Sequence, residues 1–102
     1  MGEDARYIVE IGTDLLDLAP VLMDSLSQEL EEMKRATAEA DFSLVREKAH
    51  SSRGAALTFG FDIYASELVK VTEAAKKEDA DLLQSLCNHL KSLLDSVGFK
   101  AK

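Results

Sequence analysis

The stretch DFSLVREKAHSSRGAALTFG, residues 41–60, has the spacing of one helix with a defined start and end. Asp41 is a suitable helix cap, because its carboxylate can accept hydrogen bonds from backbone amides that have no partner within the helix. Gly60 suits the position just past the helix end, where the backbone is left-handed. Small and apolar residues recur at steps of three and four, at Phe42, Val45, Ala49, Ser52, Ala56 and Phe59. This spacing predicts a helix over residues 42–59 with one buried face.

A second long helix is predicted before this stretch, over residues 20–39. Pro20 marks its start, since proline fits the first turn of a helix and disrupts an interior. Its buried stripe is expected at Leu22, Leu26, Leu30, Met33 and Thr37. The residues ahead of it, DLLDL at 14–18, are predicted to form a short helix.

Two further helices are predicted after this stretch, over residues 62–77 and 79–97. We expect Asp62 to cap the first of them and Gly98 to end the second. The first has its buried stripe at Tyr64 or Ala65, Leu68, Val71 or Thr72, and Ala75. The second has its stripe at Leu83, Leu86, Leu90, Leu93 and Val97. No segment shows the sustained alternation of a strand, so we predict no β-structure.

The fold class follows from the number and spacing of these helices. The chain has 102 residues, which allows one domain. Only a few residues join consecutive long helices, so neighbouring helices are expected to run antiparallel. We therefore predict an all-α fold, an antiparallel up-down-up-down four-helix bundle with a short N-terminal helix, as a single domain over residues 1–102.

The composition makes several classes of function unfavourable. The net charge is −7, and an acidic chain repels phosphate backbones and anionic lipids, so we expect neither nucleic acid nor a membrane as partner. No apolar run approaches the roughly 20 residues that a membrane-spanning helix needs. Cys87 is the single cysteine and cannot form an internal disulfide, which favours the reducing cytoplasm and a role as a small apolar contact.

His50 lies well off the buried stripe of the helix over residues 42–59, when residues are placed at intervals of about 100°. Its imidazole is therefore expected to be at least partly in water. Gly54 follows one turn later on the same side, although glycine inside a helix costs about 0.8–1 kcal/mol relative to alanine. The stripe continues past Gly54 to Phe59, so we expect an interior glycine. It would leave a gap beside His50 through which another molecule can approach the ring.

The segment around His50 reverses the sign of the chain's charge. Residues 46–53 hold three cations and one acid: Arg46, Lys48, Arg53 and Glu47. A local excess of positive charge favours an acidic or phosphorylated partner. Leu57 lies on the same face, where a polar residue is expected. We interpret Arg46 and Leu57 as a candidate docking surface, to which the apolar residues Leu15 and Leu18 could add.

The run AHSSRGAA, residues 49–56, followed by Phe59-Gly60, resembles the signature of histidine-containing phosphotransfer (HPt) domains. The family pattern is broadly A-H-x-L-K-G-S-A-x-x-L-G. The earlier stretch GTDLLDLAPVLMDSL is similar to the lead-in of one HPt subgroup, so the resemblance covers nearly the whole chain. Two residues depart from the pattern. Ser52 replaces the usual Leu, which would weaken a core contact, and Arg53 replaces the usual Lys, which keeps the charge but changes the donor geometry.

The resemblance implies a relay protein of two-component signalling. The outer ring nitrogen of His50, Nε2, would take a phosphoryl group from an aspartyl phosphate on one receiver domain and pass it to an aspartate of another. Arg53 and Gly54 would support this phosphorylation site. The implied partners are response-regulator receiver domains and a histidine kinase or hybrid kinase, and we expect a monomer. The resemblance implies no cofactor, metal site or ATP-dependent kinase activity in this chain, with Mg²⁺ on the receiver.

Other functions fit the same residues. One is a non-transferring helical-bundle adaptor that docks on a receiver or a histidine kinase. Another is a structural bundle, in which Gly54 and Leu57 mark a helix–helix contact and Arg53 is an ordinary solvated charge. His89 lies beside the leucine stripe of the last helix, and we predict that it flanks the core rather than forming a second site. An enzyme with a small-molecule substrate is least favoured, because no second acid, base or nucleophile converges on His50.

Overall fold

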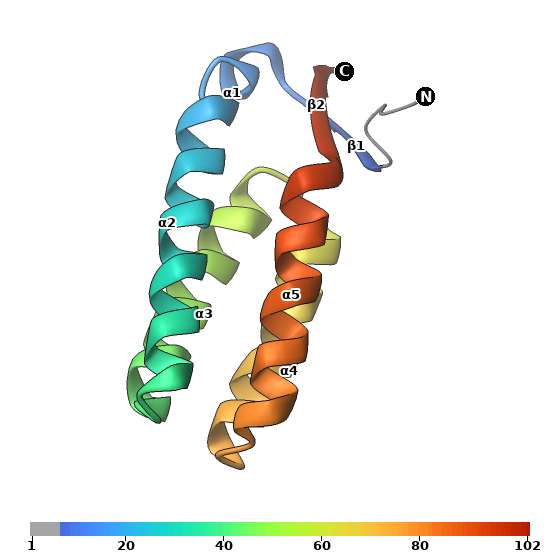
Figure 1. Ribbon diagram of the computed structural model, residues 1–102. Helices are drawn as coiled ribbons and strands as arrows, with labels where there is room; N and C mark the ends of the chain where they lie inside the picture. Colours follow the sequence, from blue (N-terminus) through green and yellow to red (C-terminus); the bar gives the residue numbers. More distant parts are fainter. Residues whose placement is uncertain (1–6) are drawn as a thin grey trace.

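A computed structural model describes residues 7–102 (Figure 1), so the first six residues of the predicted domain lie outside the described residues. The described part contains five helices and two short strands. In chain order they are β1 (Tyr7–Ile11), α1 (Thr13–Leu16), α2 (Ala19–Ala38), α3 (Phe42–Thr58), α4 (Asp62–Lys76), α5 (Ala80–Ser96) and β2 (Val97–Ala101). Most of the described chain is therefore helical, and every helix begins and ends within two residues of its predicted range.

The four long helices lie side by side, and the turns between them alternate between the two ends of the bundle (Figure 1). Helix α2 packs against α3 and α5, and α4 packs against the same two helices. The stripes predicted for α2 and α4 lie in the shared core, with α2 contributing Leu22, Leu26, Leu30, Met33 and Thr37. The stripe predicted for α5 is wrong at its end, because Leu94 is buried where Leu93 was expected and Val97 belongs to β2. At both ends of α3 the apolar stripe is less deeply placed, since Phe42 and Phe59 are half-buried.

The ends of α3 are built as the sequence predicts. The Asp41 carboxylate accepts a hydrogen bond from the Leu44 backbone N–H at 3.2 Å. Gly60 has a φ of +77°, a left-handed conformation that glycine adopts without strain.

The prediction that Asp62 caps α4 is wrong, because Phe61 occupies the cap position and Asp62 is the first helical residue. There its negative charge complements the positive end of the helix dipole.

The prediction of no β-structure is also wrong. Strands β1 and β2 pair in parallel, with Tyr7 opposite Val97 and Ile11 opposite Ala101. Helix α5 consequently ends at Ser96, before Gly98, which lies inside β2 and does not act as the helix stop. The pairing joins the two ends of the described chain, so periodicity within a short window does not reveal it.

The strand pair closes one end of the bundle (Figure 1). Val9 and Ile11 of β1 are buried, while Ile8 and Glu10, which alternate with them along the strand, are exposed. The Phe61 ring stacks on Tyr7 at 5.9 Å and on Tyr64 at 5.0 Å, and meets Phe99 edge-on at 6.0 Å between ring centroids. These aromatic contacts anchor both strands on the α3–α4 turn. None of the helices in the described residues combines the length and the apolar character needed to cross a membrane.

Candidate functional site

His50 lies at mid-length on α3 and its side chain is exposed. Within residues 7–102 its ring makes no hydrogen bond or ion pair. A hollow opens beside the ring, lined by Ser43, Arg46, Glu47, His50, Thr72 and Lys76. A second hollow adjoins it and is lined by His50, Arg53, Val69, Thr72 and Glu73. The imidazole therefore stands between α3 and α4, where a ligand or partner can reach it.

Helix α4 supplies one side of this site, which the sequence reasoning missed. Val69, Thr72 and Lys76 are spaced by three and four residues, so they lie on one face of α4. Lys76 lies in the last turn of α4, where its charge complements the helix dipole, and it also lines the hollow beside His50. The sequence shows that these residues share one face of α4. It does not show that this face lies against His50, because that depends on how α3 and α4 pack.

Gly54 is inside α3, as predicted, and is exposed. Apart from its two chain neighbours and the backbone of its own helix, no heavy atom would lie within 4 Å of a Cβ built at this position. The gap one turn after His50 is therefore open space that no other side chain of the described residues fills. Gly54 does not serve as a packing glycine within this molecule.

The other predicted residues extend along α3 in both directions from His50. Arg46 and Arg53 are exposed and line the hollows on either side of it. Leu57, which is 46% exposed, lines a neighbouring hollow together with Arg53 and Val69. The structure thus places Arg46, His50, Arg53 and Leu57 along one face of α3, against α4.

Positive charge gathers at this face of an acidic protein. Arg46, Arg53 and Lys76 line the hollows around His50. Glu47 and Glu73 also line them, and the Lys76 Nζ lies 3.6 Å from the Glu73 carboxylate in an exposed pair. Such pairs are weak in water and can rearrange when an anion arrives. The arrangement suits a nucleophilic imidazole that receives an anionic group.

A model of the Hpt domain family matches residues 17–100, which include His50 and all four long helices. The chain belongs to the Hpt domain family. Such domains take part in the phosphorelays of two-component signalling, with receiver domains and kinases as partners. Comparisons with curated proteins and with solved structures returned no match.

This Hpt domain replaces the family's usual leucine with Ser52, which is completely buried. The Ser52 hydroxyl donates a hydrogen bond to Glu29 Oε1 on α2 at 2.6 Å, and the Ser51 hydroxyl donates one to Glu29 Oε2 at 2.8 Å. A polar contact thus joins α2 and α3 where the family pattern has an apolar one. Sequence reasoning missed Glu29, because its partners are more than twenty residues away.

The second histidine of this Hpt domain binds an acid on the neighbouring helix. His89 Nδ1 lies 2.6 Å from Glu67 Oε2, and Lys70 Nζ lies 3.3 Å from Glu67 Oε1. Burial would raise the pKa of Glu67, but the hydrogen bonds from His89 and Lys70 outweigh burial and lower it. His89 therefore ties α5 to α4.

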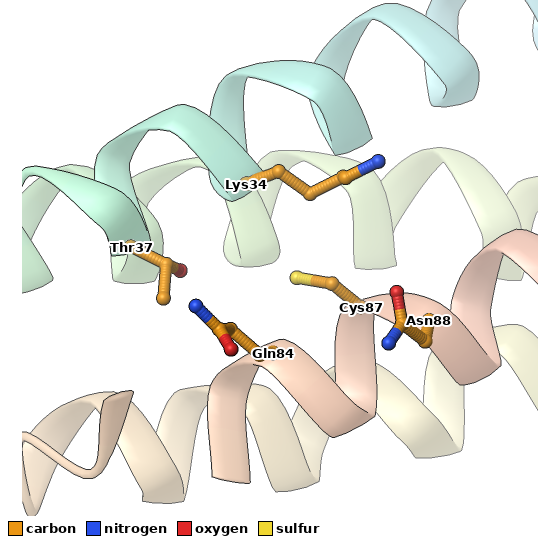
Figure 2. A pocket seen from close by; sticks show the side chains of 5 residues that line it. All are labelled: Lys34, Thr37, Gln84, Cys87 and Asn88. Carbon is orange, nitrogen blue, oxygen red and sulfur yellow. The ribbon is translucent and has the colours of Figure 1, made fainter. Parts of the chain in front are cut away.

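Cys87 lies in a separate hollow of this Hpt domain, between α2 and α5. Figure 2 shows its side chain directed from α5 toward α2, and the hollow is lined by Lys34, Thr37, Gln84, Cys87 and Asn88. Burial raises the pKa of the Cys87 thiol, which keeps it protonated and unreactive.

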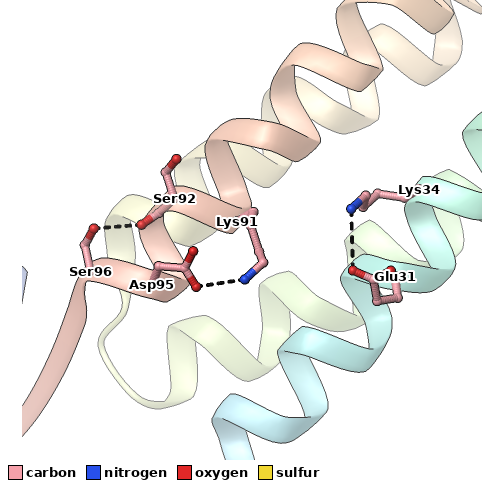
Figure 3. Close-up of polar contacts among 6 residues, drawn as sticks. All are labelled: Glu31, Lys34, Lys91, Ser92, Asp95 and Ser96. Atoms are coloured by element: carbon pink, nitrogen blue, oxygen red, sulfur yellow. Dashed lines mark hydrogen bonds and ion pairs between the residues drawn. The ribbon is translucent and has the colours of Figure 1, made fainter.

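Polar contacts on the neighbouring surface of α2 and α5 stay within single helices (Figure 3). Lys34 pairs with Glu31, and Lys91 pairs with Asp95.

Across the described part of the chain, no group of three or more His, Cys, Asp and Glu side chains is placed to hold a metal ion.

Proposed function

We propose that this Hpt domain is a phosphorelay intermediate in which His50 carries the phosphoryl group. One observation supports the proposal above all. The His50 ring is exposed at mid-helix, with open space at Gly54 and three cations, Arg46, Arg53 and Lys76, around it. A structural histidine needs neither the open space nor the cations.

The transfer step uses the lone pair of His50 Nε2, which attacks the phosphorus atom of an aspartyl phosphate on a receiver domain. The N–P bond forms as the bond from phosphorus to the aspartate oxygen breaks, and the electron pair leaves with the receiver's carboxylate. The proton on Nδ1 then passes to water. In the return step Nδ1 takes up a proton from water, and an aspartate oxygen of another receiver attacks phosphorus. The N–P bond breaks, its electron pair returns to Nε2, and the ring is again a neutral imidazole. As the resemblance implies, we assign Mg²⁺ to the receiver.

Arg46, Arg53 and Lys76 stabilise the negative charge of the phosphoryl group during its transfer. A phosphoryl group in flight carries negative charge on its three equatorial oxygens, so positioning and nearby positive charge supply most of the catalysis. Arg53 lies one turn after His50 and Arg46 lies one turn before it, so the two can contact the group from opposite sides. Lys76 approaches from α4. Gly54 leaves room for the receiver's own groups to reach the ring.

The receiver is expected to dock on the α3–α4 face. Leu57 is 46% exposed and Val69 is 44% exposed, and both lie beside Arg53. Such an area combines apolar contacts with charge that attracts an acidic partner. Exposed leucines would serve a non-transferring adaptor equally well, so docking alone does not distinguish that alternative from a relay.

The remaining parts of the proposal concern the organisation of the protein. We propose one domain over residues 1–102, a monomer in the cytoplasm, with α2 to α5 as an antiparallel up-down-up-down four-helix bundle and α1 as its short N-terminal helix. The alternating turns in Figure 1 and the packing of α2 and α4 on both α3 and α5 support this arrangement.

Label transfer from a panel of receiver domains tests the function. Each receiver is phosphorylated with radiolabelled acetyl phosphate, purified and mixed with the Hpt domain. A relay predicts acid-labile label on the Hpt domain and none on a His50→Gln variant of equal helicity. Binding of a receiver without transfer, unaffected by His50→Gln, would instead support the adaptor.

A further inference from the structure

The side chains that α3 buries completely are small, and the larger apolar residues Phe42, Leu44 and Phe59, at and near its two ends, are only half-buried against the core. Its buried residues are Val45, Ala49, Ser52 and Ala56, whereas α5 buries four leucines. Burial energy follows the apolar area removed from water, so a small rotation of α3 about its axis costs little. The apolar core alone therefore defines the rotation of α3 weakly.

A polar clamp joins α3 to α2 at the middle of this segment. The clamp consists of Glu29, Ser51 and Ser52, with one carboxylate oxygen accepting from each hydroxyl, at 2.8 Å and 2.6 Å. Hydrogen bonds to an ionised acceptor are shorter and stronger than those between neutral groups. Ser52 is completely buried, so its hydroxyl loses its partner and gains no water if α3 turns.

The two serines point in different directions around α3. Adjacent helical residues are offset by about 100° around the axis. A carboxylate that binds both hydroxyls therefore restrains the rotation of α3 about its axis, because any rotation moves at least one hydroxyl out of hydrogen-bond distance. His50 directly precedes Ser51 and lies about 200° from Ser52. With the clamp turned toward α2, the His50 ring faces away from α2 and lies beside Thr72 and Lys76 of α4.

We propose that Glu29 is a positioning residue for His50: its bonds to Ser51 and Ser52 hold α3 at the rotation that points the imidazole at an incoming phosphoryl group. This role rests on the proposed function. Transfer between fixed groups depends steeply on geometry, because Nε2 must approach phosphorus in line with the bond that breaks. Glu29 touches neither the ring nor the phosphoryl group, so it acts through the backbone of α3.

The chain offers a matched control in the same helix interface. Lys48 of α3 pairs with Glu32 of α2 at 2.9 Å, one turn from Glu29. This pair also joins the two helices, but it holds α3 through one flexible side chain and does not involve the residues that follow His50. Glu32→Ala therefore removes a cross-helix contact and leaves the clamp intact.

The first test compares label transfer from one receiver of the panel at increasing receiver concentration. We expect Glu29→Ala to lower the transfer rate at saturation by at least about tenfold, with a smaller change in the half-saturating concentration. Ser51→Ala should lower the rate by about threefold, and Ser51→Thr, which keeps the hydroxyl, should restore it. Glu32→Ala should stay within about twofold of the wild type. Equal losses in Glu29→Ala and Glu32→Ala would overturn the proposal.

The second test needs no receiver, so it separates failure of the clamp from failure of the relay. Residual dipolar couplings of the Cα–Hα bonds report the rotation of α3 relative to α2 in the folded protein. We expect altered couplings for residues 49–56 in Glu29→Ala and wild-type couplings in Glu32→Ala. Phosphoramidate is a small phosphoryl donor that needs no docking surface on the protein. The rate at which it labels His50 should therefore be the same in Glu29→Ala and Glu32→Ala as in the wild type. Unchanged couplings in Glu29→Ala would overturn the positioning role, whether or not the wild type transfers phosphate.

Discussion

Gly54 lies one helical turn after His50 on the same side of α3, and beyond the local backbone of α3 and the two neighbouring residues no heavy atom would lie within 4 Å of a Cβ at position 54. The helix therefore carries the cost of an interior glycine, about 0.8–1 kcal/mol relative to alanine, without using the space for its own packing. A gap that the molecule does not fill itself is available to a partner. The two residues together define the point of approach to the imidazole.

Gly54→Ala separates stability from function. The added methyl meets nothing in the molecule, so the free energy of unfolding should rise by about 0.8–1 kcal/mol. Transfer from a receiver should fall, because the methyl occupies the approach to His50. Urea unfolding and label transfer measure the two effects. A variant that is more stable and transfers at the wild-type rate would show that the gap is not used.

Tyr64→Phe should leave the protein as stable as the wild type or make it more stable. The Tyr64 ring is completely buried, and its hydroxyl has no hydrogen-bond partner in residues 7–102. Burial raises the pKa of this hydroxyl, which keeps it neutral. Removing an unpaired buried hydroxyl should raise the free energy of unfolding by about 1 kcal/mol, as measured by urea unfolding. A loss of stability would reveal a buried partner, such as an ordered water.

The Glu67–His89 pair should give the protein part of its stability at neutral pH. Because folding lowers the pKa of Glu67, its contribution is complete above the unfolded-state pKa, about 4.3, and is lost as the pH falls through the lower folded-state pKa. Glu67→Gln should therefore be less stable than the wild type at about pH 7, with the difference shrinking below about pH 4. Urea unfolding across this range measures it.

The control for this prediction is Glu73→Gln, which removes an exposed ion pair with Lys76 on the same helix. Exposed pairs contribute little, so its stability should follow the wild type at every pH. A stability difference for Glu67→Gln that does not change with pH would mean that the carboxylate charge is not involved.

The Cys87 thiol should react slowly in the folded protein. Cys87 is 2% exposed, and burial raises its pKa, so both access and the thiolate fraction are reduced. We expect the rate of reaction with a disulfide reagent to be at least about 100-fold lower in the native state than in the unfolded state, because α5 must first open locally. A fast native reaction would show that the hollow between α2 and α5 opens easily.

The helices were predictable because each carries its own signals. Asp41 and Gly60 bound α3 as expected, and the leucine spacing of α5 predicts its buried face as far as Leu90. Beyond Leu90 the buried residue is Leu94 and not Leu93, because the two positions compete near the end of the helix and spacing alone does not choose between them. The strand pair was not predictable in the same way. The segment YIVEI has strand-forming residues, but it is five residues long and its partner lies at the other end of the chain. Pairing over that distance leaves no local periodicity.

The candidate site was predictable on α3 and not elsewhere. His50, Arg53 and Gly54 belong to one short motif, so their proximity follows from helical spacing. Thr72 and Lys76 reach the same hollow from α4, which depends on how two helices rotate against each other. Ser52 was expected to weaken the core, but its bond to Glu29 could only be found once α2 and α3 were placed side by side.

The most direct measurement of the central claim is the position of the phosphoryl group after transfer. The wild-type protein is incubated with a phosphorylated receiver, digested at neutral pH and analysed by tandem mass spectrometry. The account predicts the added phosphoryl mass on His50 and its absence in His50→Gln, with His89 unmodified in both. A phosphoryl group on His89, or transfer that persists in His50→Gln, would contradict it.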